Sequence, residues 1–155
     1  MLTRLRLPGI ARDGGPPPPN PADTLWALMN AAREQNGLVP YRRSAILDRA
    51  AQMRCDDLVA RNYFAHTTPD GVTGYTAALT SLGVSWAWAG ENIAGNNYPL
   101  ERAAQIAHEG LMNSPTHRAN ILEPRDFDAA GVAYAFRPHD GWHLFTQIFH
   151  SGGGV

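Results

Sequence analysis

The chain has 155 residues and a mass of 16.9 kDa, which suits a single domain. Hydrophobic residues make up 44% of it, and 13 basic residues stand against 14 acidic ones. This composition excludes disorder throughout and argues against charge-driven binding to nucleic acid or to an acidic membrane surface. No apolar run approaches the ~20 residues that a transmembrane helix needs. The single cysteine, Cys55, excludes an intrachain disulfide.

Two segments precede the predicted domain. Residues 1–12 form an N-terminal arm in which leucine and arginine alternate between Leu2 and Leu7. The arm lacks the apolar stretch of a conventional signal peptide. It is expected either to fray or to dock on a neighbouring subunit as an added strand. Residues 13–21 form a Gly/Pro-rich linker, because four consecutive prolines favour an extended spacer. Self-association through Met1–Pro19 is therefore one expectation.

The first half of the predicted domain, residues 22–150, is helical. Asn20 and Pro21 form a helix start, and Asn36-Gly37 ends that helix. Ser44 caps a second, longer helix. The apolar stripe of the second helix consists of Leu47, Ala51, Cys55 and Leu58. Since Cys55 belongs to this stripe, it is expected to be a small core residue and not a nucleophile.

The second half changes from helical to strand periodicity. The predicted segments are a short helix over 74–82, an extended segment over 86–94, a helix opened by Pro99 and a turn from Pro115 to Ile121. Two strands follow over 131–136 and 142–149, joined by a hairpin turn, and residues 151–155 form a flexible Gly-rich tail. Helices first and a small antiparallel sheet last indicate an α+β fold.

A few polar residues stand where a site is expected. His66 lies in an irregular segment, and His117 follows a helix break at Ser114-Pro115. Glu91 lies in the apolar segment from Trp86 to Ala94. A buried carboxylate needs a partner because an unpaired buried charge is costly, and an imidazole or a metal ion would serve.

Standard catalytic and metal-binding motifs are absent from the sequence. It contains no His-Glu-x-x-His, no Cys-x-x-Cys and no Gly-x-Ser-x-Gly motif, and no phosphate-binding loop. The residues alone therefore predict an α+β domain with a His/Glu pocket and do not define a reaction.

Several sequence blocks resemble one known family. They are Tyr63-Phe-Ala-His66 with Pro69-Asp-Gly71, Gly90-Glu-Asn-Ile-Ala94, Asn113-Ser-Pro-Thr-His-Arg-Ala-Asn-Ile-Leu122, Gly131-Val132 and Phe145-Thr-Gln-Ile-Phe149. In this order they resemble the CAP superfamily, which joins cysteine-rich secretory proteins, antigen 5 and pathogenesis-related 1 proteins. The likeness is to its bacterial, disulfide-free SCP-like branch, and it covers residues 23–149.

The resemblance implies a fold and a site. The fold is an α-β-α sandwich with a small, mostly antiparallel central sheet flanked by helices. Many eukaryotic members line a central cleft with two histidines and two acidic residues, and His66 and Glu91 match the first of each. The second acid falls near Ser114, with Glu109 as one substitute. The second eukaryotic histidine falls at Ala129-Ala130, so His117 is expected to supply the second ring.

The resemblance also yields functional expectations. The favoured one is an extracellular or cell-surface binding or structural module, because the acidic pair is incomplete. Its cleft residues are His66, Glu91, Ser114 and His117, and its ligand is an unidentified small or extended molecule. His66, His117 and Glu91 are candidate ligands for zinc or another divalent cation. The alternative is a metal-dependent hydrolase acting on peptide or cell-wall substrates, with Glu91 as the base.

Overall fold

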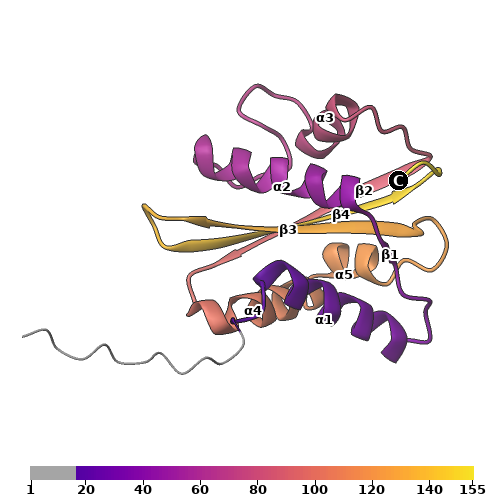
Figure 1. The fold of residues 1–155 in the computed structure, drawn as a ribbon, viewed down its shortest axis with the longest axis horizontal. Coiled ribbons are helices and arrows are strands. Elements are labelled where there is room, and N and C mark those ends of the chain that lie inside the picture. The colour runs from indigo at the N-terminus through magenta and orange to yellow at the C-terminus, as the bar shows by residue number, and fades with distance from the viewer. Residues whose placement is uncertain (1–16) are drawn as a thin grey trace, which may run out of the picture.

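The computed structural model describes residues 17–155, so the predicted arm over 1–12 and the first part of the linker lie outside the described residues. Helices and strands alternate along the chain in an order that places most helices first (Figure 1). The elements are α1 (Pro21–Gln35), β1 (Arg42–Arg43), α2 (Ala45–Ala60), α3 (Gly74–Ser81), β2 (Trp88–Asn96), α4 (Leu100–Met112), α5 (Pro115–Ile121), β3 (Ala129–Arg137) and β4 (Trp142–Ser151).

A central sheet separates two layers of helices. Its strand order is β1-β3-β4-β2, and only the two-residue β1 runs parallel to its neighbour. Helices α2 and α3 cover one face, while α1, α4 and α5 cover the other (Figure 1). The predicted α-β-α sandwich is confirmed. In this order β2 forms one edge of the sheet.

The predicted helix starts follow from local hydrogen bonding. The Asn20 side chain accepts a hydrogen bond from the backbone N–H of Ala22 at 2.9 Å, with Pro21 in the first turn of α1. Ser44 caps α2 in the same way by accepting from the N–H of Leu47. Strand β1 was not predicted, because its two residues are extended through pairing with Ala129 and Ala130, far along the chain.

The core lies on both faces of the central strand β4. Successive side chains of a strand point to opposite faces. Accordingly Phe145 and Phe149 pack with α1, α4 and α5, whereas Ile148 packs with α2 and α3. Helix α2 approaches β3 very closely, since a Cβ on Gly131 would lie 2.1 Å from the carbonyl carbon of Leu47. Glycine is therefore required at this position.

Cys55 is a core residue, as the helical stripe predicts. It is fully buried in α2, and its thiol donates to the hydroxyl of Thr146. Burial raises the pKa of this thiol to about 12, so it stays protonated at neutral pH. At the end of the chain, Val155 packs against the core cluster that contains Cys55. Its carbonyl oxygen accepts a hydrogen bond from Arg42 at 2.6 Å.

Across residues 17–155 the longest helix has 16 residues. In that part of the chain no helix combines the length and the apolar character required to cross a bilayer.

Candidate functional site

Two consecutive residues in the middle of β2 organise the site. Glu91 and Asn92 are both buried, and as neighbours in a strand they point to opposite faces of the sheet. Glu91 meets α2 on one face, and Asn92 meets α5 on the other. The edge strand thus carries one polar network on each side.

The first network is ionic. Arg54 of α2 donates two hydrogen bonds to the carboxylate of Glu91, from Nε to Oε2 at 2.7 Å and from Nη2 to Oε1 at 3.2 Å. Both side chains are almost completely removed from solvent, at 2% and 0% exposure. Burial by itself lowers the pKa of Arg54, but the hydrogen bonds and charge of Glu91, with help from Tyr63, raise it overall. Arg54 is therefore a cation, and the carboxylate of Glu91 is its buried counter-ion.

Other contacts hold the Arg54 guanidinium in place. It donates from Nη1 to the hydroxyl of Tyr63 at 2.6 Å and from Nη2 to the carbonyl of Ala65 at 2.9 Å. A Cβ on Gly74 would lie 2.2 Å from Nη1. The guanidinium therefore occupies the space that a side chain at Gly74 would need. Through these contacts Arg54 connects the loop before α3 to the sheet.

His66 is attached to this ionic pair. Its Nδ1 lies 2.8 Å from Oε1 of Glu91, and its side chain is about half exposed. An ionised carboxylate only accepts hydrogen bonds, so Nδ1 carries the proton and donates. In the neutral ring the lone pair is then on Nε2, which has no hydrogen-bond partner among the described residues.

The second network is uncharged. The amide of Asn92 donates to the carbonyl of His117 and to Oε1 of Gln147, both at 3.0 Å. Asn120 donates to Oδ1 of Asn92 at 2.9 Å. Two of these partners belong to α5, so Asn92 fixes that short helix against the edge of the sheet. A side-chain-to-backbone role for Asn92 agrees with its residue type.

His117 sits on α5 beside the break at Ser114. Its Nδ1 lies 2.9 Å from the hydroxyl of Ser114, which immediately precedes the helix. Burial lowers the pKa of His117, and repulsion from His66 lowers it further. The ring is therefore mostly neutral at pH 7.

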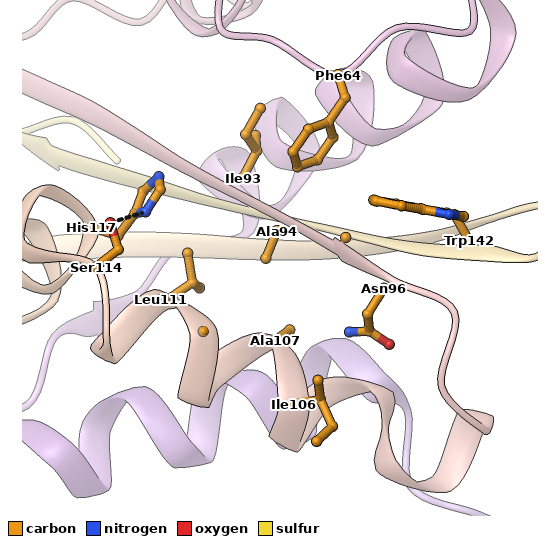
Figure 2. Close-up of a pocket in the computed structure, with 12 residues that line it drawn as sticks. Phe64, Ile93, Ala94, Asn96, Ile106, Ala107, Leu111, Ser114, His117 and Trp142 are labelled. Carbon is orange, nitrogen blue, oxygen red and sulfur yellow. Dashed lines mark hydrogen bonds between the residues drawn. The ribbon is translucent and has the colours of Figure 1, made fainter.

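An apolar groove of about 370 Å³ leads to this end of the site (Figure 2). Figure 2 shows Phe64 above β2, helix α4 below it, and the hydrogen-bonded Ser114 and His117 at one end. The groove is lined by Phe64, Ile93, Ala94, Gly95, Asn96, Ile106, Ala107, Gly110, Leu111, Ser114, His117 and Trp142.

The four candidate residues form two bonded pairs. One pair is His66 with Glu91, and the other is Ser114 with His117. Only the second pair lines the groove. Glu109 is exposed on α4, where it accepts from Gln105, and it joins neither pair.

Sequence reasoning missed the main partner of Glu91. The expected partner was an imidazole or a metal ion, and the structure adds Arg54. A signal was present, because Arg54 lies seven residues after Leu47 and four before Leu58, within the apolar stripe of α2. A charged residue at such a position must be paired in the interior.

The candidate metal ligands do not form a closed site. Residues 17–155 contain no group of three or more His, Cys, Asp or Glu side chains placed to hold a metal ion. Both oxygens of Glu91 already accept from Arg54 or His66. Among the candidate ligands, the two histidine rings each keep an Nε2 without a hydrogen-bond partner among the described residues.

Comparison with known proteins agrees with this architecture. Residues 26–149 match the model of the cysteine-rich secretory protein family, CAP. The chain belongs to the CAP family. A curated relative, the uncharacterized protein YkwD of Bacillus subtilis, is 36% identical over 122 residues, which are 79% of this CAP protein and 44% of YkwD. This chain therefore spans less than half the length of that relative.

Solved structures share the fold. An extracellular SCP-domain protein from Bacillus anthracis matches with a TM-score of 0.71 and 26% identity, over 85% of this chain and 40% of its own. An outer surface protein of Borrelia burgdorferi matches with a TM-score of 0.72 and 19% identity, over 86% of this chain and 93% of its own. These matches confirm a bacterial-type CAP fold.

Proposed function

We propose that this CAP domain is an extracellular or cell-surface binding module. The observation that supports the proposal best is the apolar groove beside β2, which ends at the Ser114–His117 pair. A concave, mostly apolar surface with a few polar groups at one end is the usual form of a ligand site. The structural relatives named above, one extracellular and one an outer surface protein, support the location.

Ser114 and His117 are proposed as the polar end of the groove, and His66, held by Glu91, as a further polar group of the binding site. Each histidine has its Nδ1 engaged, by Glu91 or by Ser114, which leaves Nε2 of each ring without a hydrogen-bond partner among the described residues. Such support through the other ring nitrogen is typical of metal-binding histidines. Zinc or another divalent cation is thus a proposed ligand of His66 and His117, where it would polarise an oxygen of the bound molecule.

A distant structural relative supports a cation in this fold. The Ancylostoma-secreted protein Ac-ASP-7 has been solved in a manganese-bound form, at 9% identity to this chain and with a TM-score of 0.59. In this chain the role of Glu91 differs from that of a metal ligand. It holds the ring of His66, because Arg54 and His66 occupy both of its oxygens.

The contacts of Glu91 also favour binding over the alternative, a metal-dependent hydrolase of peptide or cell-wall substrates. A general base needs a free lone pair near the proton that it removes. The Glu91 side chain is 0% exposed and paired with Arg54, so its lone pairs already accept hydrogen bonds and do not face a substrate.

A dye-binding titration tests the groove. The apolar fluorophore 8-anilinonaphthalene-1-sulfonate is titrated into the wild type, a Gly110→Phe variant and a Gly110→Ala control. Gly110 lines the groove, and a Cβ there meets nothing within 4 Å, so the backbone accepts a side chain at this position and phenylalanine is chosen to obstruct the groove. We expect the phenylalanine variant to lose binding at least tenfold and the alanine variant to retain it. Equal binding by all three would contradict the proposal.

Calorimetric titration with Zn²⁺ alone tests the polar end. We expect one weak site in the wild type, which His66→Ala and His117→Ala each weaken, while His139→Ala, an exposed histidine elsewhere, leaves it unchanged. Zn²⁺ binding that survives both site substitutions would show that the histidines are not its ligands. The dye titration would still test the groove independently.

A further inference from the structure

The outer edge of β2 offers unpaired backbone groups. Strand β2 pairs along its length with β4 and forms the end of the sheet. Among the described residues, no backbone hydrogen bond joins residues 89–96 to any partner outside β4. An exposed strand edge is a ready template for another strand.

The groove follows this edge instead of lying on one face of the sheet. Four consecutive residues of β2, from Ile93 to Asn96, all line it. Because successive side chains point to opposite faces, four in a row can border one groove only if it runs along the strand's side. An occupant in the groove would therefore lie beside the free backbone groups, as an added strand does.

The two walls of the groove differ in chemistry. On the α2 side the wall is aromatic and consists of Phe64 and Trp142, with Phe64 46% exposed. On the other side the wall is aliphatic, with Ile106 and Leu111 of α4 (Figure 2). A strand added here would have one row of side chains against aromatic rings and the other row against aliphatic groups.

A segment of this chain has the matching pattern. Leu5 and Leu7 alternate with Arg4 and Arg6 near the N-terminus. In an extended conformation the leucines share one face and the arginines the other. Leucine suits the aliphatic wall, and guanidinium groups bind favourably over aromatic rings. The two faces of the segment thus match the two walls.

The described part of the chain starts close to one wall of the groove. Pro18 and Pro19 lie beside Leu100 at the start of α4, the helix that forms the lower wall. Nine residues separate Leu7 from Pro17, and in extended form they span about 30 Å. Ile106 lies six residues after Leu100, about 9 Å along α4. The intervening residues are therefore longer than the distance along α4, which leaves length for contact with a second copy.

We infer that residues 2–7 of one molecule bind as an added strand along the β2 edge of a second copy of this chain. A second copy is favoured because the four prolines at 16–19 form a stiff, extended spacer. A stiff spacer disfavours the tight turn that would return the segment to its own β2. The inference rests on the proposed function, since it names the occupant of the proposed groove.

Solution mass tests the inference with the full chain. Light scattering and sedimentation are measured over a concentration series for the wild type, for Leu5→Asp/Leu7→Asp, and for Thr3→Ser as a matched control. We expect the wild type and the control to exceed the monomer mass of 16.9 kDa. The double aspartate variant is expected to remain a monomer. A wild type that stays monomeric throughout the series, or a double variant that still associates, would overturn the inference.

A peptide assay then locates the contact. A labelled peptide of residues 1–12 is titrated into the full-length Leu5→Asp/Leu7→Asp protein, whose own segment is disabled, and fluorescence anisotropy is recorded. We expect saturable binding that Gly110→Phe, added to this protein, weakens at least tenfold and that Gly110→Ala leaves within twofold. Unaltered binding in the phenylalanine variant would place the contact elsewhere and overturn the inference.

The dye titration separates the two levels of failure. If the dye binds in the groove but the peptide does not, the groove remains a binding site and the proposed occupant is wrong. If neither binds, the proposed function fails together with the inference.

Discussion

Glu91 and Asn92 are adjacent in β2, and both are buried, with 5% and 0% of the whole residue exposed. The cost of burying a polar group is nevertheless compensated differently on the two sides of the sheet. On the α2 side a carboxylate is matched by a buried guanidinium. On the α5 side a neutral amide is matched by other amides and a carbonyl. Each side then supports one histidine, His66 through its ring and His117 through its backbone.

The difference shows what each network can tolerate. An ion pair in the interior is stable only while both charges remain, because a lone buried ion has no solvent to compensate it. A neutral network loses less when one member is removed, because an unsatisfied amide costs less than an unsatisfied charge. The ionic side is therefore the fragile one, and it is the side that orients the exposed ring of His66.

The largest effect is expected for Arg54→Leu, which leaves Glu91 buried without its cation. We expect the free energy of unfolding to fall by about 3–5 kcal/mol, the cost of breaking a buried pair from one side. Urea denaturation measures it. The double variant Arg54→Leu/Glu91→Leu should recover a large part of the loss, because it leaves no lone charge. A double variant as unstable as the single one would contradict this account.

Gly74→Ala should damage the same network by crowding it. The new Cβ would lie 2.2 Å from Nη1 of Arg54, so the guanidinium must move. We expect a loss of about 1–3 kcal/mol, typical of overpacking. Gly110→Ala is the matched control, since its Cβ meets open space within a helix and should be neutral or stabilising. Equal losses in the free energy of unfolding for the two variants would contradict the conclusion that Gly74 leaves space for the Arg54 guanidinium.

Asn92→Ala tests the neutral side and is expected to cost less than Arg54→Leu. The substitution leaves the carbonyl of His117 and the amides of Gln147 and Asn120 without a shared partner. A loss of about 1–3 kcal/mol is expected from unsatisfied buried polar groups. Hydrogen exchange should show faster exchange in α5, while α2 is unaffected. If Asn92→Ala costs more than Arg54→Leu, the contrast between the two sides is wrong.

The smallest effect couples the two sides through their histidines. Burial lowers the pKa of His117, and the charge of His66 lowers it further, so His66→Gln should raise it while leaving it below 6.5. An NMR titration of the metal-free protein measures the shift. Because the pKa of His117 is depressed by folding, its contribution to stability is present above the unfolded value of about 6.5 and is lost as pH falls. An unchanged pKa in His66→Gln would place the two rings out of electrostatic reach.

Much of the fold could be predicted from the sequence because its signals are local. Asn20 and Ser44 cap helices within two or three residues of themselves, and the apolar stripe of α2 repeats within one or two turns. The two long strands of the C-terminal hairpin also show in their period of two. Strand β1 left no such signal, because its pairing with Ala129 and Ala130 bridges more than eighty residues.

The candidate site divides in the same way. His66, Glu91, Ser114 and His117 could be chosen from residue type and family resemblance. Their partners were decided by tertiary structure, since Arg54 and Glu91 are 37 residues apart, and His66 and Glu91 are 25 residues apart. The sequence by itself determined the elements and which side chains must find partners. The packing of α2 and α5 against opposite faces of β2 determined which residues became the partners of Glu91 and Asn92. The physical reason is that neighbouring side chains of a strand point to opposite faces of the sheet.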